Sequence, residues 1–176
     1  MTLQDGTPIS LSARELEDGQ QYCMSDDRGL KPLVEYLTAH VAEVHSPPHP
    51  CHVAITCGNT SALDCVLRST CTAGDVVLVE EYCYAPALQL CSALGLVVHQ
   101  VACDTQGPCA ATLRQLLETL GGRVKAFYCV PVSANPTGVT WSQARKQEVY
   151  DIASQHNVLL IEDGACLMLI LHMARI

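Results

Sequence analysis

The chain has 176 residues, of which 49% are hydrophobic, a composition typical of one folded domain with a sizeable core rather than of a disordered chain. Its 18 acidic and 10 basic residues give a formal net charge of −8 without a dense lysine and arginine stripe, which disfavours nucleic acid as a partner. The first ten residues, MTLQDGTPIS, lack the features of a signal peptide and no apolar run could span a bilayer, so we expect a cytoplasmic protein outside the membrane.

Helices and strands are predicted to alternate along almost the whole chain. Leucines and valines at helical spacing indicate the first helix, and short apolar runs indicate the strands. Ser142 is expected to cap one helix, and Gly121 with Gly122 to end another. The predicted order is helix 30–44, strand 52–56, a helix from about Ser61, strand 76–80, helix 86–94, strand 96–101, helix 113–120, strand 125–130, helix 142–155 and strand 158–163.

Short apolar strands separated by helices predict an α/β fold in three layers, with a mostly parallel sheet between two layers of helices. We divide the chain into an N-terminal arm with an amphipathic helix (1–50), an α/β core (51–163) and an apolar tail (164–176). The carboxyl ends of parallel strands are where ligands gather in such sheets, so the polar residues after each strand are candidates for a site.

The eleven cysteines do not suggest a disulfide framework, because their number is odd and no C-x-x-C pair occurs. Several stand in apolar segments, as Cys65, Cys91 and Cys129 do, and are predicted to be buried free thiols. A structural metal is a less favoured alternative for one group in a proline-rich stretch, since its spacing fits none of the common zinc motifs. That group is His45, His49, Cys51, His52 and Cys57.

Two of the candidate segments suit an anionic or a flat ligand. Asn59, Thr60 and Ser61 open a helix directly after a predicted strand, so they could seat a phosphate or could simply cap the helix. Tyr84 follows the next strand and could stack on a heterocycle, or it could be an ordinary core or surface tyrosine.

The other two candidates are single polar side chains beside rigid or apolar backbone. Asn135 projects from the turn VPVSANPTG, where two prolines fix φ and a glycine allows a conformation that other residues avoid, so the turn is expected to be rigid. Asp163 ends an apolar strand, so its carboxylate calls for a cation such as a protonated ring nitrogen, unless it only caps a loop. A phosphate, a ring face, a phenolic oxygen and a ring nitrogen together describe pyridoxal 5′-phosphate.

The ordered motifs GNTSALD, GDVVLVEEYCYAPALQ, VPVSANPTG and VLLIED resemble the class I/II, fold-type-I pyridoxal-phosphate aminotransferases, and most closely the fungal aromatic and the kynurenine/α-aminoadipate types. The resemblance runs from about residue 21 to Asp163 and implies the fold of the family's large cofactor-binding domain. It implies that Asn59 and Thr60 help hold the phosphate, Tyr84 stacks on the pyridine, Asn135 binds the phenolic oxygen and Asp163 pairs with the ring nitrogen. It also implies a dimer, because Tyr22 matches a tyrosine that reaches the neighbouring subunit's cofactor.

The sequence departs from the family after Asp163, where Gly164, Ala165, Cys166 and Leu167 replace an acidic residue, a proline and two aromatics. The family's Schiff-base lysine lies downstream of this aspartate, whereas the lysines here are Lys31, Lys125 and Lys146, so no catalytic residue is carried over. The small C-terminal domain is likewise not matched, and we expect a truncated form.

Two functions remain open at this point. The first is amino-group transfer between an amino acid, for instance an aromatic one, and a 2-oxo acid, by a homodimer. The second is a non-catalytic binding or dimerisation module that pairs with a full-length relative. A generic nucleotide-binding protein is disfavoured, because neither G-x-G-x-x-G nor a Walker A lysine occurs.

Overall fold

The computed structural model describes residue 8, residue 10 and residues 12–15 and 28–165. The chain divides into two compact units, Met1–Cys57 and Gly58–Ile176. Tyr22 and most of the predicted tail, residues 166–176, lie outside the described residues.

In the first unit, the predicted helix 30–44 is confirmed as α2 (Lys31–His45), which ends at Ser46 in the left-handed region. The expected strand 52–56 is wrong. Residues 51–56 have no regular secondary structure, and the backbone N–H of Ile55 bonds to the carbonyl of Arg28 at 2.7 Å instead. An apolar run becomes a strand only where a neighbouring strand completes its hydrogen bonds, and no described strand pairs with this segment.

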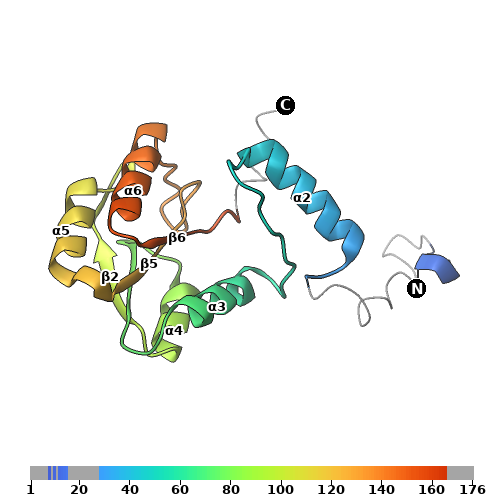
Figure 1. The fold of residues 1–176 in the computed structure, drawn as a ribbon, viewed down its shortest axis with the longest axis horizontal. Helices are drawn as coiled ribbons and strands as arrows, with labels where there is room; N and C mark the ends of the chain where they lie inside the picture. Colours follow the sequence, from blue (N-terminus) through green and yellow to red (C-terminus); the bar gives the residue numbers. More distant parts are fainter. Residues whose placement is uncertain (1–7, 9, 11, 16–27, 166–176) are drawn as a thin grey trace. The chain divides into compact units, whose positions relative to one another are not determined.

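The second unit contains a parallel four-stranded sheet with the order β2-β1-β5-β6, which confirms the other four predicted strands (Figure 1). The strands are β1 (Val76–Glu80), β2 (Val97–Val101), β5 (Val124–Cys129) and β6 (Leu159–Glu162). β1 is buried along its whole length, because it pairs with β2 and β5 and its side chains pack into cores on both faces of the sheet.

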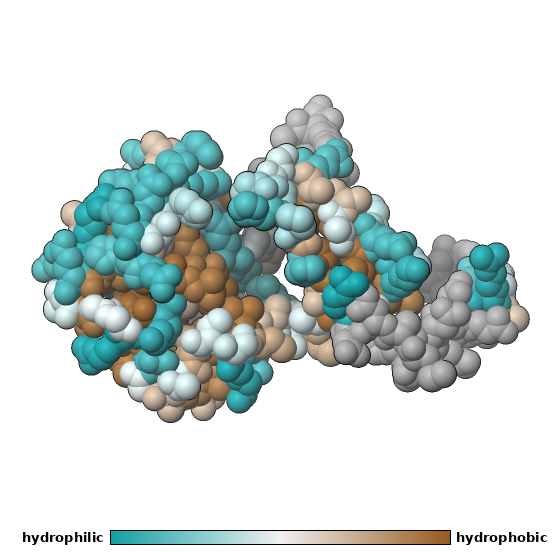
Figure 2. Space-filling model, in the orientation of Figure 1, coloured by the Kyte–Doolittle hydropathy of each residue, from teal (hydrophilic) through white to brown (hydrophobic). Residues whose placement is uncertain are grey.

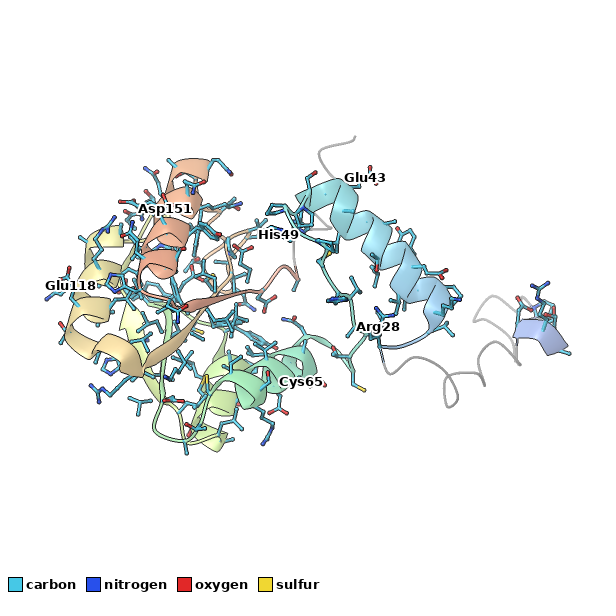
Figure 3. The ribbon with its side chains drawn as sticks, in the orientation of Figure 1. Arg28, Glu43, His49, Cys65, Glu118 and Asp151 are labelled. Atoms are coloured by element: carbon cyan, nitrogen blue, oxygen red, sulfur yellow. The ribbon has the colours of Figure 1, made fainter. Side chains whose placement is uncertain are left out.

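Helices cover both faces of this sheet, so the predicted three-layer α/β architecture is confirmed. One face packs against α5 (Ala110–Leu120) and α6 (Gln143–Gln155), and the other against α3 (Asn59–Thr70) and α4 (Ala85–Ala93). Alternate residues of β1 enter the two cores, because successive strand side chains point to opposite faces. Glu118 and Asp151 lie on the exposed side of α5 and α6 (Figure 3), where the surface is largely hydrophilic (Figure 2).

The predicted helix boundaries follow from local chemistry. The hydroxyl of Ser142 accepts a hydrogen bond from the backbone N–H of Arg145 at 3.2 Å, which confirms it as the cap of α6. α5 ends at Gly121, whose φ of 58° is a conformation that glycine adopts without strain. No helix in the described part of the chain is long and apolar enough to cross a membrane.

The cysteines that the structure describes are free thiols. Cys91 and Cys129 are buried as predicted, and burial raises the pKa of both. The expectation for Cys65 is wrong, because its side chain lies on the exposed side of α3 (Figure 3). An apolar neighbourhood in the sequence does not tell which side of a helix faces the core.

A short antiparallel hairpin, β3 (Cys103–Asp104) with β4 (Gly107–Pro108), was not predicted from the sequence. Gly107 has φ of 112°, and a Cβ there would meet the ring of Trp141 at 2.6 Å. Arg145 ties this hairpin to α6: its guanidinium donates to the carbonyls of Gly107 at 3.1 Å and Pro108 at 2.6 Å, and to the Asp104 carboxylate at 3.0 Å. Two-residue strands are too short to show an alternating pattern.

Replacing Arg145 by methionine is expected to lower the free energy of unfolding by roughly 1–2 kcal/mol, because two backbone carbonyls lose their donor. Urea denaturation would measure the change. Arg68→Met is the matched control, since Arg68 forms an ion pair with Asp64 on its own helix and is largely exposed. Equal losses in the two variants would contradict this account of the hairpin.

Candidate functional site

The parallel strands β1, β5 and β6 end at one edge of the sheet, so the segments that follow them lie along that edge. Tyr84 follows β1, Asn135 follows β5 and Asp163 follows β6. The backbone N–H of Asp163 bonds to the carbonyl of Cys129 at 2.8 Å, which continues the pairing of β5 and β6 by one residue. The expectation that Asn135 and Asp163 share one edge of the sheet is therefore met.

Asp163 is the centre of a hydrogen-bond network at this edge. It is only 8% exposed, and its Oδ2 accepts bonds from the side-chain amide of Asn59 at 2.6 Å and from the hydroxyl of Tyr128 at 2.7 Å. Its Oδ1 accepts the backbone N–H of Ala165 at 3.1 Å. The fold thus brings Asn59 and Asp163 together across 104 residues of sequence.

The donors around Asp163 are neutral groups. Burial, and then the hydrogen bond to Asp163, raise the pKa of Tyr128 well above its usual range, so this phenol keeps its proton and donates. Burial, followed by the charge of Glu80, raises the pKa of the nearby Cys83 thiol to about 12. None of the ion pairs formed between described residues includes Asp163. The carboxylate is therefore hydrogen-bonded but not neutralised within this part of the chain.

The N-terminus of α3 lies beside this carboxylate, because Asn59 is the first residue of the helix. Gly58 occupies the N-cap with φ of 99° and provides no side-chain cap. The carbonyl of Gly58 accepts the backbone N–H of Ala62 at 3.2 Å, which is the first hydrogen bond of the helix. The first N–H groups of a helix have no intrahelical acceptor and carry a partial positive charge. Thr60 is exposed and Ser61 half-buried at the same helix end. This helix end can therefore bind an anion.

Tyr84 stands at the N-cap of α4, and its half-buried side chain packs against the core on the α3 and α4 face. Its carbonyl accepts the N–H of Ala87 at 3.0 Å, which fixes the backbone from which the ring projects. After burial, the charges of Glu80 and Asp163 contribute to the raised pKa of the preceding residue, Cys83. The ring of Tyr84 is thus attached to backbone close to the Asp163 network.

Asn135 lies in an exposed position on a tightly bonded loop, which is defined here as the Asn135 loop, residues 131–140. Ala134 N–H bonds to the carbonyl of Val139 at 2.9 Å, and Gly138 N–H bonds to the carbonyl of Ala134 at 2.6 Å. The Asn135–Pro136 peptide bond is cis. The two backbone hydrogen bonds show that the segment forms a closed turn, with Asn135 in its exposed part.

Two residues of this edge escaped the sequence analysis, Tyr128 and Glu80. Both are buried: Tyr128 donates its hydroxyl to Asp163, and Glu80 accepts the backbone N–H of Val130, which precedes the Asn135 loop. A signal was present for Glu80, since it is a carboxylate at the end of the otherwise apolar strand VVLVE. Tyr128 gave none, because a tyrosine within an apolar strand is ordinary.

The alternative metal site has no structural support in the region that the structure covers. His45 ends α2, and His49, Cys51, His52 and Cys57 follow it without regular secondary structure. Among the described residues, no group of three or more His, Cys, Asp and Glu side chains is placed to hold a metal ion.

Residues 12–165 match the family model described as aminotransferase class I and II. The chain is 38% identical over 141 residues to the aminotransferase swnA of Metarhizium robertsii, and 34% identical over 138 residues to an aromatic amino acid aminotransferase of Schizosaccharomyces pombe. These alignments cover 77% and 74% of the chain but 28% and 29% of the relatives.

Among solved structures, the Pyrococcus horikoshii kynurenine aminotransferase in complex with PMP superposes with a TM-score of 0.76 at 29% identity, over 84% of this chain and 37% of that one. The chain therefore spans less than half the length of each of these proteins. The resemblance expected from the four motifs, and the fold that it implies, are confirmed.

Proposed function

The chain belongs to the class I and II aminotransferase family, and from this premise we propose that its α/β part is the pyridoxal 5′-phosphate-binding region of an aminotransferase. The observation that carries the proposal is the buried carboxylate of Asp163, which three neutral donors hold and no cation of the described residues pairs with. A protonated pyridine nitrogen is the cation that would neutralise it. The N-terminus of α3, which lies beside the same carboxylate and has no side-chain cap, suits the phosphate. The residues present thus fit this cofactor.

Each proposed contact uses a different part of the cofactor. Asp163 would pair with the ring nitrogen, while Asn59 both orients Asp163 and, with Thr60 and Ser61, lines the phosphate position. Asn59 is therefore proposed to have two roles. Its side-chain amide donates to the Asp163 carboxylate, and its backbone is the first residue of α3, at the proposed phosphate position. This double use explains why an asparagine suits the first position of the helix.

The remaining contacts are proposed from the position of each residue along the edge. Tyr84 would cover one face of the ring, and Asn135 would donate to the phenolic oxygen from its rigid loop. When bound, pyridoxal 5′-phosphate supplies an electron-withdrawing ring that stabilises negative charge developing at the α-carbon of an amino acid. Asp163 would serve that chemistry by keeping the ring nitrogen protonated.

We propose an amino acid and a 2-oxo acid as substrates, with an aromatic amino acid as the first donor to test. The printed names of the relatives support this choice, because they include an aromatic amino acid aminotransferase and a kynurenine aminotransferase. A homodimer is proposed as the assembly, in which Tyr22 would reach the phosphate of the neighbouring subunit's cofactor.

The alternative function is a non-catalytic module that binds cofactor or pairs with a full-length relative. One observation favours it for this part of the protein: the lysines of the second unit, Lys125 and Lys146, belong to β5 and α6 rather than to the candidate site. Within the second unit, Lys125 stands near the amino end of β5, where it donates to the carbonyl of Gly122 at 3.1 Å. The 176-residue polypeptide would thus bind the cofactor without covalent attachment.

Pyridoxamine 5′-phosphate is the best probe of the proposed site, because it carries the phosphate, phenolic oxygen and ring nitrogen but cannot condense with surface lysines. By calorimetry, we expect it to bind at least tenfold more tightly than pyridoxamine, since the phosphate contacts at α3 each contribute about as much as a charged hydrogen bond. The double variant Thr60→Val, Ser61→Ala should reduce the ratio between the affinities for pyridoxamine 5′-phosphate and pyridoxamine. Thr70→Val, at the other end of α3, should not.

Two results would contradict the proposed function. One is the absence of any pyridoxamine 5′-phosphate binding by the folded chain, with circular dichroism as the check of folding. The other is equal affinity for pyridoxamine with and without its phosphate, which would exclude the end of α3 as the phosphate position.

A further inference from the structure

Glu80 is the last residue of β1 and has a carboxylate that no proposed cofactor contact uses. It is 5% exposed, and each of its oxygens accepts one hydrogen bond: Oε2 from the backbone N–H of Val130 at 2.8 Å, and Oε1 from the indole N–H of Trp141 at 3.0 Å. Burial raises the pKa of Glu80, while these two bonds lower it. A buried carboxylate is costly unless hydrogen bonds satisfy it, and these two bonds tie Glu80 to both of their donors.

The two donors lie immediately before and immediately after the Asn135 loop. Val130 precedes the loop, and Trp141 follows it, so one side chain bridges both ends of the segment. The backbone N–H of Trp141 also donates to the carbonyl of Pro131 at 2.9 Å, which joins the two ends of the loop directly. We call these contacts the Glu80 bridge. They join positions 50 and 61 residues away from Glu80 in the sequence.

Trp141 is packed in the core, so the bridge attaches the end of the loop to the core. The ring is 4% exposed, stacks with Phe127 at a centroid distance of 6.4 Å and lies against the backbone of Gly107. Phe127 belongs to β5 and is fully buried. The end of the Asn135 loop is therefore fixed to the sheet through an aromatic pair as well as through Glu80.

The outer part of the loop has less support from packing. A pocket of about 320 Å³ is lined by residues of the hairpin, by Thr137 and Val139 of the loop, and by Glu80 and Tyr82. Residues 135–138 are exposed. Order at Asn135 must therefore come from the hydrogen bonds within the loop and from its anchored base.

We propose that Glu80 is a positioning residue, which orders the Asn135 loop through the bridge and thereby sets the Asn135 amide for the phenolic oxygen of the cofactor. What Asn135 does for the cofactor rests on the proposed function, whereas the ordering of the loop by Glu80 does not. Glu80 touches neither cofactor nor substrate in this account; its effect passes through the backbone of residues 130–141.

The variant Glu80→Gln tests the loop first, in the absence of any cofactor. Glutamine keeps the size of the side chain but has one acceptor oxygen, so its amide NH₂ must face either Val130 N–H or the indole N–H. We expect the amide protons of Ala134 and Gly138 to exchange roughly tenfold faster, the effect of losing one charged hydrogen bond. Trp141, the single tryptophan of the chain, should change its emission in the same variant.

Two further variants separate the bridge from general destabilisation. Glu81→Gln makes the same chemical change one residue along, at a carboxylate that accepts the N–H of Cys103 in the hairpin, and should leave exchange in the loop unchanged. Trp141→Phe removes the indole donor while keeping an aromatic ring on Phe127, and should speed exchange at Ala134 and Gly138 in the same direction as Glu80→Gln. Unchanged exchange in both folded bridge variants would overturn the proposal.

A double-mutant cycle on pyridoxamine 5′-phosphate affinity tests whether Glu80 acts through Asn135. We expect Asn135→Ala to weaken binding roughly tenfold, and Glu80→Gln to add nothing further in the double variant. Losses that multiply would mean that Glu80 affects the site by another route, and would overturn the positioning role. If the unmodified chain does not bind the probe, the proposed function fails, while the exchange experiment still decides whether the bridge orders the loop.

Discussion

The polypeptide of 176 residues, purified alone, is expected to show no transamination above that of free pyridoxal 5′-phosphate when given an aromatic amino acid and 2-oxoglutarate. The reaction needs a base beside the α-carbon of the bound amino acid, and general acid–base steps of this kind contribute on the order of 10²–10⁴-fold. Loss of covalent positioning of the cofactor adds to that deficit.

The positions of the basic residues explain the expected deficit. Lys125 is the second residue of β5 and so stands at the opposite end of that strand from the site. Lys146 belongs to α6, on the face of the sheet that α3 does not cover. Asp163 and Asn135 can bind and orient the ring, but neither is a base placed at the α-carbon.

A chimera provides the positive control for this prediction. Residues 1–163 would be joined to the region that follows the matching aspartate in the Schizosaccharomyces pombe relative, and turnover should then rise above the level of free cofactor. Asp163→Ala in the chimera should remove it again. Clear turnover by the short chain, persisting after host transaminases have been removed, would refute the expectation.

Replacing Asp163 is expected to have the largest effect of any single substitution at the site. In Asp163→Ala the amide of Asn59 and the hydroxyl of Tyr128 lose their shared acceptor, which should cost roughly 2–4 kcal/mol of unfolding free energy. Affinity for pyridoxamine 5′-phosphate should fall about 100-fold or more, because the protonated ring nitrogen loses its buried counter-charge.

Asp163→Asn separates these two effects. Asparagine retains one acceptor oxygen and the size of the side chain, so we expect a smaller loss of stability together with nearly the full loss of affinity. Tyr128→Phe is the matched control, since it removes a donor but leaves the charge of Asp163 in place, and should change affinity only a few-fold. Urea denaturation and calorimetry measure the two quantities. Full affinity in a folded Asp163→Asn protein would exclude an ionic contact with the ring.

Local signals in the sequence determined most of the secondary structure and the sheet-edge placement of Tyr84, Asn135 and Asp163. The buried strand VVLVE, the cap at Ser142 and the helix end at Gly121 each depend on a few adjacent residues, so the sequence shows them directly. Asp163 was recognisable because a carboxylate that ends an apolar strand needs a partner. The resemblance to a family supplied the roles of Tyr84 and Asn135, which remain proposals.

Only the tertiary structure decided which distant groups meet. The apolar segment 52–56 is not a strand, because pairing requires a neighbour that its own residues do not specify. The bond from Tyr128 to Asp163 and the Glu80 bridge span 35, 50 and 61 residues, and they exist because β1, β5 and β6 end side by side. Secondary structure follows from neighbours along the chain, whereas a buried polar group finds its partners only when the strands align, since their order and register are set by the packing of the whole core.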